Sequence, residues 1–94
     1  SVYELEFSQL QTKLNSAISL NQHYKNQLAY FESTALPATN IIIDGAQKQL
    51  INGEINYLEW VMLIQQAVQV EYNYVDVIQQ YNQQLIQLHY LLKH

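Results

Sequence analysis

This sequence is poor in the residues that interrupt regular structure or supply common chemistry. Its 94 residues include no cysteine, only 1 proline and only 2 glycines. Without cysteine the chain has neither disulfide bonds nor thiolate chemistry, although this absence fits reducing and oxidising compartments equally well. Because proline and glycine are the main punctuators of a chain, their scarcity predicts a few long elements.

Positive charge is also scarce. All 4 basic residues are lysines, and the formal net charge is -4. Nucleic acids are bound by clustered positive charge, so we expect no nucleic-acid partner. The sequence has no apolar run of about 18 residues, the length that a membrane-spanning helix needs. It also lacks a basic-then-apolar leader at its start, so we expect any export signal to lie outside this sequence.

Apolar residues, by contrast, are plentiful at 49%, which argues against disorder. A chain of this length forms one small domain, and we expect that domain to be part of a larger protein. The fold class that the sequence predicts is all-α: a long antiparallel helical hairpin with coiled-coil-like packing. The expected parts are a first helix over residues 1–36, a second helical segment over 38–52, a tip turn over 53–56 and a return helix over 57–92.

The tip of this hairpin carries the sharpest local signals. Gly53 suits the position after a helix end, where positive φ is often required. Asn56 is a suitable N-cap for the next helix, and Glu59 stands three residues later, as in a capping box. Ile55 and Trp60 occupy the positions of a hydrophobic staple. The stop and start signals are so close that two helices must fold back on each other.

The first arm has an apolar seam that advances in steps of four and three residues, the pattern of a coiled coil. Asn21 is its only polar member, and we interpret it as a residue that sets register rather than as a ligand-binding residue. The seam consists of Tyr3, Phe7, Leu10, Leu14, Ala17, Asn21, Tyr24, Leu28, Phe31 and Ala35.

Pro37 interrupts this arm. In a helix interior, proline clashes with the carbonyl four residues earlier, here that of Ser33, and disfavours helical angles at Leu36. The sequence therefore predicts a kink or a short break around Ser33–Pro37. Downstream, residues 41–45 read Ile-Ile-Ile-Asp-Gly, which also fits a strand followed by a turn. If this segment is helical instead, Gly45 lowers the stability of the helix, and it marks a point at which another backbone could approach closely.

The second arm, from Tyr57 to Leu92, contains neither glycine nor proline. Its apolar residues form more heptad rows than a two-helix seam uses, so we expect it to be covered on more than one side, by the first arm, by self-association or by further chain. The rows are Trp60, Ala67, Tyr74, Tyr81 and Leu88; Leu63, Val70, Val77 and Leu91; Ile64, Ile78, Leu85 and Leu92, with Glu71 among them; and Val61, Val68 and Val75.

The motifs of common enzymes and cofactor sites are missing. There is no glycine-rich phosphate loop and no His-Glu-x-x-His zinc pair. His89 and His94 are five residues apart, which does not place them on one helical face. Glu54 and Glu59 could form a carboxylate pair, but Glu59 is assigned to capping. We therefore expect no enzyme activity, no cofactor and no metal site.

The residues around the tip resemble a known family. Leu36-Pro37-Ala38 before a helix, the tip run from Asn52 to Glu59 and the Tyr/Asn/Gln-rich run from Tyr81 to Leu92 are similar to the C-terminal part of the TolC-like outer-membrane efflux proteins. The version fused behind RND-type heavy-metal (cation) efflux pumps is the most similar. The likeness covers residues 36–92.

This resemblance implies a fold and a function. Full-length members are trimers with a β-barrel in the outer membrane and a helical barrel in the periplasm. Their hairpin tips dock a periplasmic adaptor (membrane fusion) protein, which works with an RND transporter. The likeness thus implies a periplasmic location, a role as tunnel wall, and an adaptor-docking tip at Gly53, Glu54, Ile55, Asn56 and Tyr57. Asn56 stands where the family usually has Ser or Thr. The alternative interpretation is a generic coiled-coil association module without a transport role.

Overall fold

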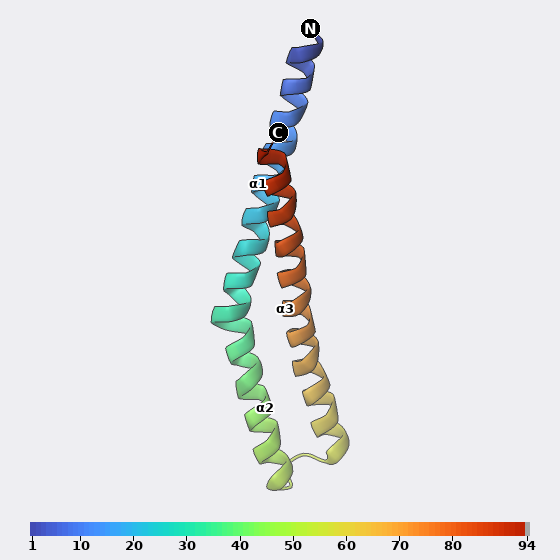
Figure 1. The fold of residues 1–94 in the computed structure, drawn as a ribbon. Helices are drawn as coiled ribbons and strands as arrows, with labels where there is room; N and C mark the ends of the chain where they lie inside the picture. Colours follow the sequence, from blue (N-terminus) through green and yellow to red (C-terminus); the bar gives the residue numbers. More distant parts are fainter. Residues whose placement is uncertain (94) are drawn as a thin grey trace.

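The structure, a computed structural model, describes residues 1–93 as an extended helical hairpin. Helix α1 (Val2–Tyr30), the π-helical segment η1 (Phe31–Ala35) and helix α2 (Leu36–Ile51) follow one another as a single arm. Helix α3 (Tyr57–Leu92) returns antiparallel beside them (Figure 1). The predicted all-α hairpin is confirmed. The return helix has the predicted bounds, and the residues between Ile51 and Tyr57 make the turn.

The strand alternative for residues 41–45 is wrong, because these residues lie inside α2. Their burial follows a helical period rather than the alternation of a strand: Ile41 is 73% exposed, Ile42 is 47% exposed and Ile43 is half-buried. No residue in the described part of the chain is assigned to a strand. Packing of one face of this segment against α3 therefore decides its structure, despite its β-branched composition.

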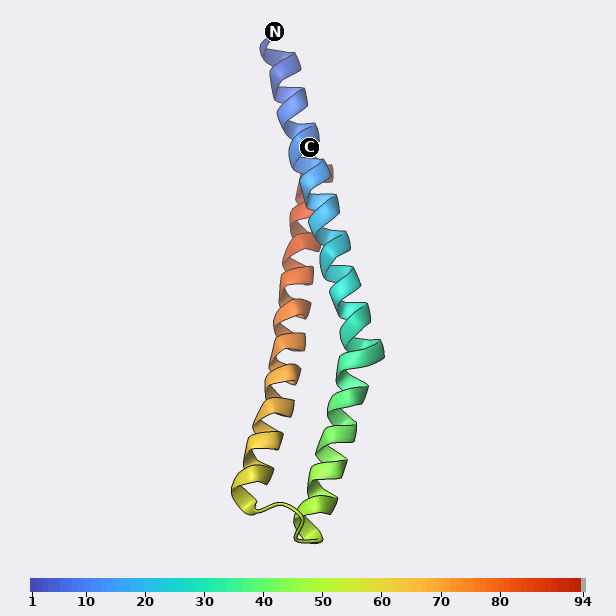
Figure 2. The same ribbon diagram turned by 180° about the vertical axis from the view of Figure 1, so that it is seen from behind.

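The hairpin is long and thin, with extents of 74 × 21 × 16 Å. The first arm is longer than α3, and its N-terminal part continues past the end of α3 in both ribbon views (Figures 1 and 2). The seam residues of this overhang have no partner helix, so Tyr3 is 83% exposed and Phe7 is 67% exposed. The chain thus leaves its first turns projecting instead of folding them back over α3.

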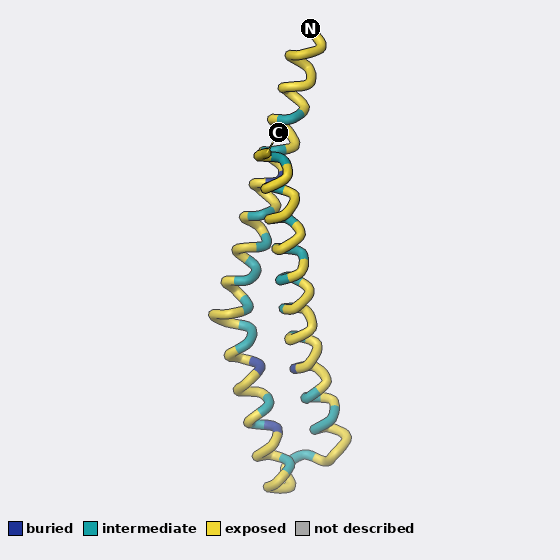
Figure 3. The backbone as a smooth tube through the Cα atoms, viewed as in Figure 1, coloured by how far each residue is buried: buried dark blue, intermediate teal, exposed yellow. Residues whose placement is uncertain are grey.

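The two arms meet along a narrow seam. Each predicted seam residue from Leu10 to Ala35 is buried or half-buried, and the less exposed positions lie on the sides of the arms that face each other (Figure 3). The fully buried residues are all small: Ala17, Thr39, Ala46 and Ala67. A hairpin with so few buried side chains depends on close approach of its arms, because large side chains at these positions would separate them.

Asn21 takes its predicted place in this seam. It is half-buried, and its Nδ2 is buried without a hydrogen-bond partner among residues 1–93. The rings of Phe31 and Tyr74 pack together with centroids 5.7 Å apart. Asn21 precedes Phe31 by as many residues as Gln84 follows Tyr74. In an antiparallel hairpin this places Asn21 and Gln84 at the same level, and Gln84 is also half-buried. A half-buried polar residue in an otherwise apolar seam suits a register-setting role.

Only part of the apolar surface of α3 is covered by the first arm. The rows that start at Trp60 and Leu63 face the seam, and their members are buried or half-buried. The other two rows form what we call the α3 flank: Val61, Ile64, Val68, Val75, Ile78, Leu85 and Leu92. Within it, Val61, Ile64 and Ile78 are half-buried, whereas Val68 is 37%, Leu85 41%, Val75 49% and Leu92 65% exposed. The expectation that α3 is covered on more than one side is therefore not met within a single chain.

The predicted disturbance near Pro37 takes the form of a π-helix rather than a break. The Leu36 N–H donates to the carbonyl of Phe31, five residues earlier, and Leu36 keeps helical angles with φ −67° and ψ −45°. The expectation that Leu36 leaves the helical region is wrong, and Pro37 lies in the first turn of α2. The wider turn lets the arm continue past the proline, since a π-turn displaces the carbonyl with which the ring would clash in an α-helix. The Thr39 hydroxyl also donates to the carbonyl of Ala35, at 2.9 Å.

Gly45 is an ordinary helical position, and the expected close backbone approach is not found. A Cβ atom built on Gly45 would meet no atom within 4 Å. Gly45→Ala is expected to stabilise the hairpin by about 1 kcal/mol, because alanine loses less backbone entropy in a helix. Chemical denaturation checks this value. Gly53→Ala is the matched control and should destabilise the hairpin, because Gly53 has φ 75°. Equal or lower stability of the Gly45 variant would contradict the prediction.

Candidate functional site at the hairpin tip

Gly53 ends the first arm as the sequence predicts. Its φ is 75°, a conformation that side-chain-bearing residues adopt at a cost. The Gly53 N–H donates to the carbonyl of Leu50 at 3.2 Å, and the Glu54 N–H donates to the carbonyl of Gln49 at 2.8 Å. These bonds form a Schellman motif, which satisfies carbonyls at the end of α2 and turns the chain sharply.

Asn56 begins α3 with the predicted capping box. The Glu59 N–H donates to Asn56 Oδ1 at 2.8 Å, and the Asn56 N–H donates to Glu59 Oε1 at 3.4 Å. Asn56 has extended backbone angles, φ −88° and ψ 172°, as an N-cap requires. The Glu59 carboxylate also places negative charge in the first turn, where the helix dipole is positive. Asn56 Oδ1 and Glu59 Oε1 thus both take part in holding the turn.

Trp60 lies beneath the tip rather than projecting from it. It is half-buried, as is Ile55, its expected staple partner. The Trp60 ring packs against that of Tyr57, with centroids 5.8 Å apart, and its buried Nε1 has no hydrogen-bond partner in the described part of the chain. This placement fits a structural staple better than an exposed aromatic anchor.

The predicted docking residues lie together on a short exposed turn. Gly53, Glu54 and Asn56 are exposed, and Tyr57 is 70% exposed. Sequence reasoning missed the apolar side chains that surround this turn. Ile51 is 84%, Leu58 67% and Met62 53% exposed. Their signal was available, because each lies next to the tip but outside the seam rows. The tip therefore presents a mixed surface of large apolar groups beside the carboxylates of Glu54 and Glu59.

The cap gives a direct test of what holds the tip. Asn56→Ala is expected to destabilise the hairpin by about 0.5–2 kcal/mol, because the Glu59 N–H loses its acceptor at the helix start. Asn56→Ser should be nearly silent, since serine accepts the same bond. Thermal melts of both variants beside the parent provide the measurement. If the alanine variant and the parent melt together, Asn56 does not act as a cap.

A polar contact joins the arms midway along the hairpin. The Tyr74 hydroxyl donates to Glu32 Oε1 at 3.0 Å. This hydrogen bond raises the pKa of Tyr74 above its ordinary value of 10.0, and burial and the negative charge of Glu32 act in the same direction. The residues are 42 positions apart in sequence, so no local pattern announces the contact.

The raised pKa sets the pH at which this contact matters. The folded state favours the protonated form of Tyr74. The stability that the contact contributes is therefore complete at pH values below the pKa of this tyrosine in the unfolded chain, and it is lost as the pH rises through the higher pKa of the folded state. We expect the parent to have a higher melting temperature than the Tyr74→Phe variant at neutral pH, and we expect this difference to disappear in strongly alkaline solution. Melts of both proteins across the alkaline range check this. A difference that grows with pH would contradict it.

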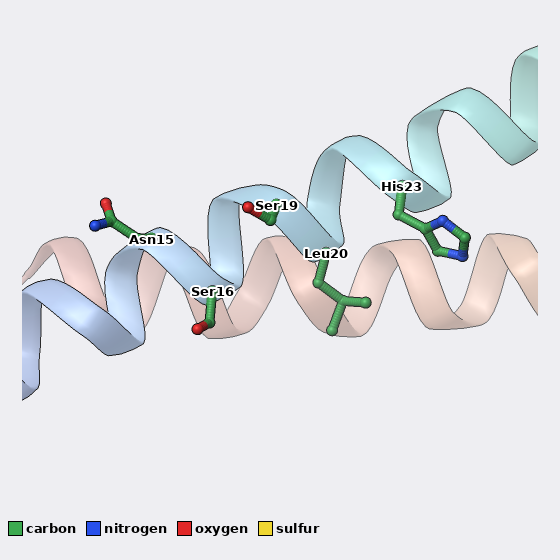
Figure 4. A pocket seen from close by; sticks show the side chains of 5 residues that line it. All are labelled: Asn15, Ser16, Ser19, Leu20 and His23. Atoms are coloured by element: carbon green, nitrogen blue, oxygen red, sulfur yellow. The ribbon is translucent and has the colours of Figure 1, made fainter.

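Open hollows lie elsewhere on the described surface. One lies along α1 and is lined by Asn15, Ser16, Ser19, Leu20 and His23, whose side chains spread over a single helix (Figure 4). Among residues 1–93, no three His, Asp or Glu side chains are grouped so that they could hold a metal ion. His94 lies outside the described residues. Over the same range, no helix is both long and apolar enough to cross a membrane.

Comparison of the chain with protein-family models, with curated proteins and with solved structures finds no match.

Proposed function

We propose that this chain is a mechanical element, the periplasmic helical hairpin of a TolC-like cation-efflux component. In this role it forms part of a tunnel wall, and its tip docks a periplasmic adaptor protein that works with an RND transporter. The observation that carries the proposal is the α3 flank. It is a largely apolar face running along a long helix, and the hairpin's own first arm covers it only in part, leaving Val68, Val75, Leu85 and Leu92 exposed.

A wall of side-by-side helices accounts for this flank. Each helix of such a wall has two neighbours, so it needs apolar residues on two sides and polar residues on the sides that face water. In helix α3 the seam rows meet the first arm. The flank rows follow one residue later and offer Val68 and Val75 to a second neighbour, and exposed Gln and Asn residues occupy much of the remaining helix surface. A stand-alone two-helix coiled coil would use one seam only.

The tip supports the docking part of the proposal. A short turn held by a Schellman motif and a capping box is rigid, so its exposed side chains are presented in a fixed arrangement. Ile51, Tyr57 and Leu58 supply exposed apolar area, and Glu54 supplies charge at the turn itself. Apolar and aromatic groups with a charged neighbour are suitable for contact with another protein.

Site-specific crosslinking in a complete efflux operon tests the proposal. A photoreactive residue at position 54 or 55 is expected to crosslink efficiently to the adaptor. A residue at position 47, which is exposed on α2 but lies away from the turn, serves as the control and should not reach it. Glu54→Lys should reduce efflux if the tip makes the predicted contact.

One set of results would overturn the transport role. If positions 54 and 55 crosslink only within the outer-membrane component, and efflux is intact after Glu54→Lys, the tip is only a turn. The generic coiled-coil association module would then be the better interpretation.

A further inference from the structure

The seam of the first arm changes phase at η1. Up to Ala35 it follows the heptad that starts near Tyr3. Beyond η1 every seam residue stands one position later than this heptad demands. The later seam consists of Leu36, Thr39, Ile43, Ala46 and Leu50, which are all buried or half-buried. Ala35 and Leu36 are adjacent, and both occupy the same seam position. The arm therefore contains one extra residue at this level.

The original phase would make a poor contact with α3. Continued past Ala35 without a shift, it would put Ala38, Ile42, Gly45 and Gln49 on the seam. That set includes a glycine and a glutamine. The shifted phase instead supplies the large aliphatic side chains of Ile43 and Leu50 and two small residues, Thr39 and Ala46, which are buried. The phase shift thus increases the apolar surface that the tip half of the arm buries against α3.

A π-turn is the helical way to hold an extra residue. Its hydrogen bonds join residues five apart instead of four, so one residue is added while the helix continues. The bond from the Leu36 N–H to the Phe31 carbonyl has this spacing, and it spans the point at which the phase changes. We propose that η1 is a register-setting insertion, fixed by the heptad seam and by α3, and that Pro37 only makes use of the wider turn.

Contacts from α3 hold the insertion at this level. Tyr74 packs its ring against Phe31, with centroids 5.7 Å apart, and donates its hydroxyl to Glu32 at 3.0 Å. Phe31 and Glu32 are the first two residues of η1. One side chain of α3 therefore contacts the start of the π-turn through both an apolar and a polar group. The inference concerns the folding of the hairpin and stands whether or not the chain has a transport role.

The first experiment separates the seam from the proline as the cause of the π-turn. In Pro37→Ala, a continuous α-helix is free to form, yet the seam still requires the extra residue. Scalar coupling across hydrogen bonds, measured by NMR, identifies the acceptor of the Leu36 N–H. We expect it to remain the Phe31 carbonyl. A change of acceptor to the Glu32 carbonyl, four residues before Leu36, would overturn the proposal.

The second experiment removes the extra residue. Deletion of the exposed Ser33 in the Pro37→Ala background should turn η1 into α-helix and put Leu36 in the heptad position that Ala35 now holds, so that the seam on both sides forms one continuous heptad. This variant is expected to melt at or above the Pro37→Ala protein. Deletion of the exposed Lys25 in the same background is the matched control, because it moves Leu28 and Phe31 off the seam. It should lower the melting temperature by roughly 10 °C or more. Equal losses from the two deletions would overturn the register-setting role.

Discussion

Ala46→Leu is expected to destabilise the hairpin by about 1–3 kcal/mol, the usual effect of adding volume to a packed site. Ala46 is only 2% exposed, the lowest value among the residues that form the core. Ala46 follows Phe31 by one residue more than Trp60 precedes Tyr74, and η1 holds one extra residue. The Phe31–Tyr74 contact therefore places Ala46 opposite Trp60. A leucine here must compete with a large, half-buried indole, so it forces the arms apart or pushes the ring out.

Urea denaturation of the variant and the parent measures this effect. Ala29→Leu is the matched control, because Ala29 is exposed on α1 and its substitution should change stability little. Fluorescence of Trp60, the single tryptophan, reports whether the indole becomes more exposed in the Ala46 variant. A leucine variant as stable as the parent would mean that the arms are not in close contact at this level.

A loss of this size matters because the hairpin has so little core. Small domains have only a few kcal/mol of net stability, and a two-helix structure buries less surface than a globular domain of equal length. The residues that are fully buried contribute little area each, since three of them are alanines and one is threonine. Their value lies in allowing the half-buried leucines, valines and tyrosines of both arms to pack together.

The local parts of this structure could be predicted from the sequence. The turn depends on a glycine with positive φ and on the cap formed by Asn56 and Glu59, and each signal lies within a few residues of its effect. The seam of the first arm could also be predicted, because the heptad pattern indicates which positions face the partner helix. The predicted bounds of α3 match the structure for the same reason.

The parts that were missed depend on contacts between the arms. Pro37 suggested a kink, but the kind of disturbance depends on how the seam on both sides of it fits α3. The contact of Tyr74 with Glu32 and Phe31 joins distant residues, and neither arm alone specifies it. The rows of α3 were visible in the sequence, whereas the choice of which rows face the first arm required the register of the whole hairpin.

The second large effect concerns the exposed part of the α3 flank, which we expect to drive self-association. Exposed apolar surface of this extent is unusual on a soluble monomer, and the first arm does not fold back to cover it. Sedimentation of the chain should therefore show dimers or higher species at micromolar concentration. The expectation applies with or without a transport role, because it depends only on the flank.

Val68→Glu combined with Val75→Lys tests this prediction without changing the net charge. Both valines are exposed in the single chain, at 37% and 49%, so the fold should be retained while the flank gains two charges that would be buried on association. We expect the dissociation constant to rise by about tenfold or more, because burying one fully exposed valine contributes about 1.5–3 kcal/mol and the surface still exposed on the two valines, 37% and 49%, amounts to nearly that of one valine. Gln66→Glu combined with Asn73→Lys places the same charges, at the same spacing, on the opposite side of the seam and should leave association unchanged. A parent chain that is monomeric throughout the micromolar range, or equal weakening by both pairs of substitutions, would show that the flank is not an association surface.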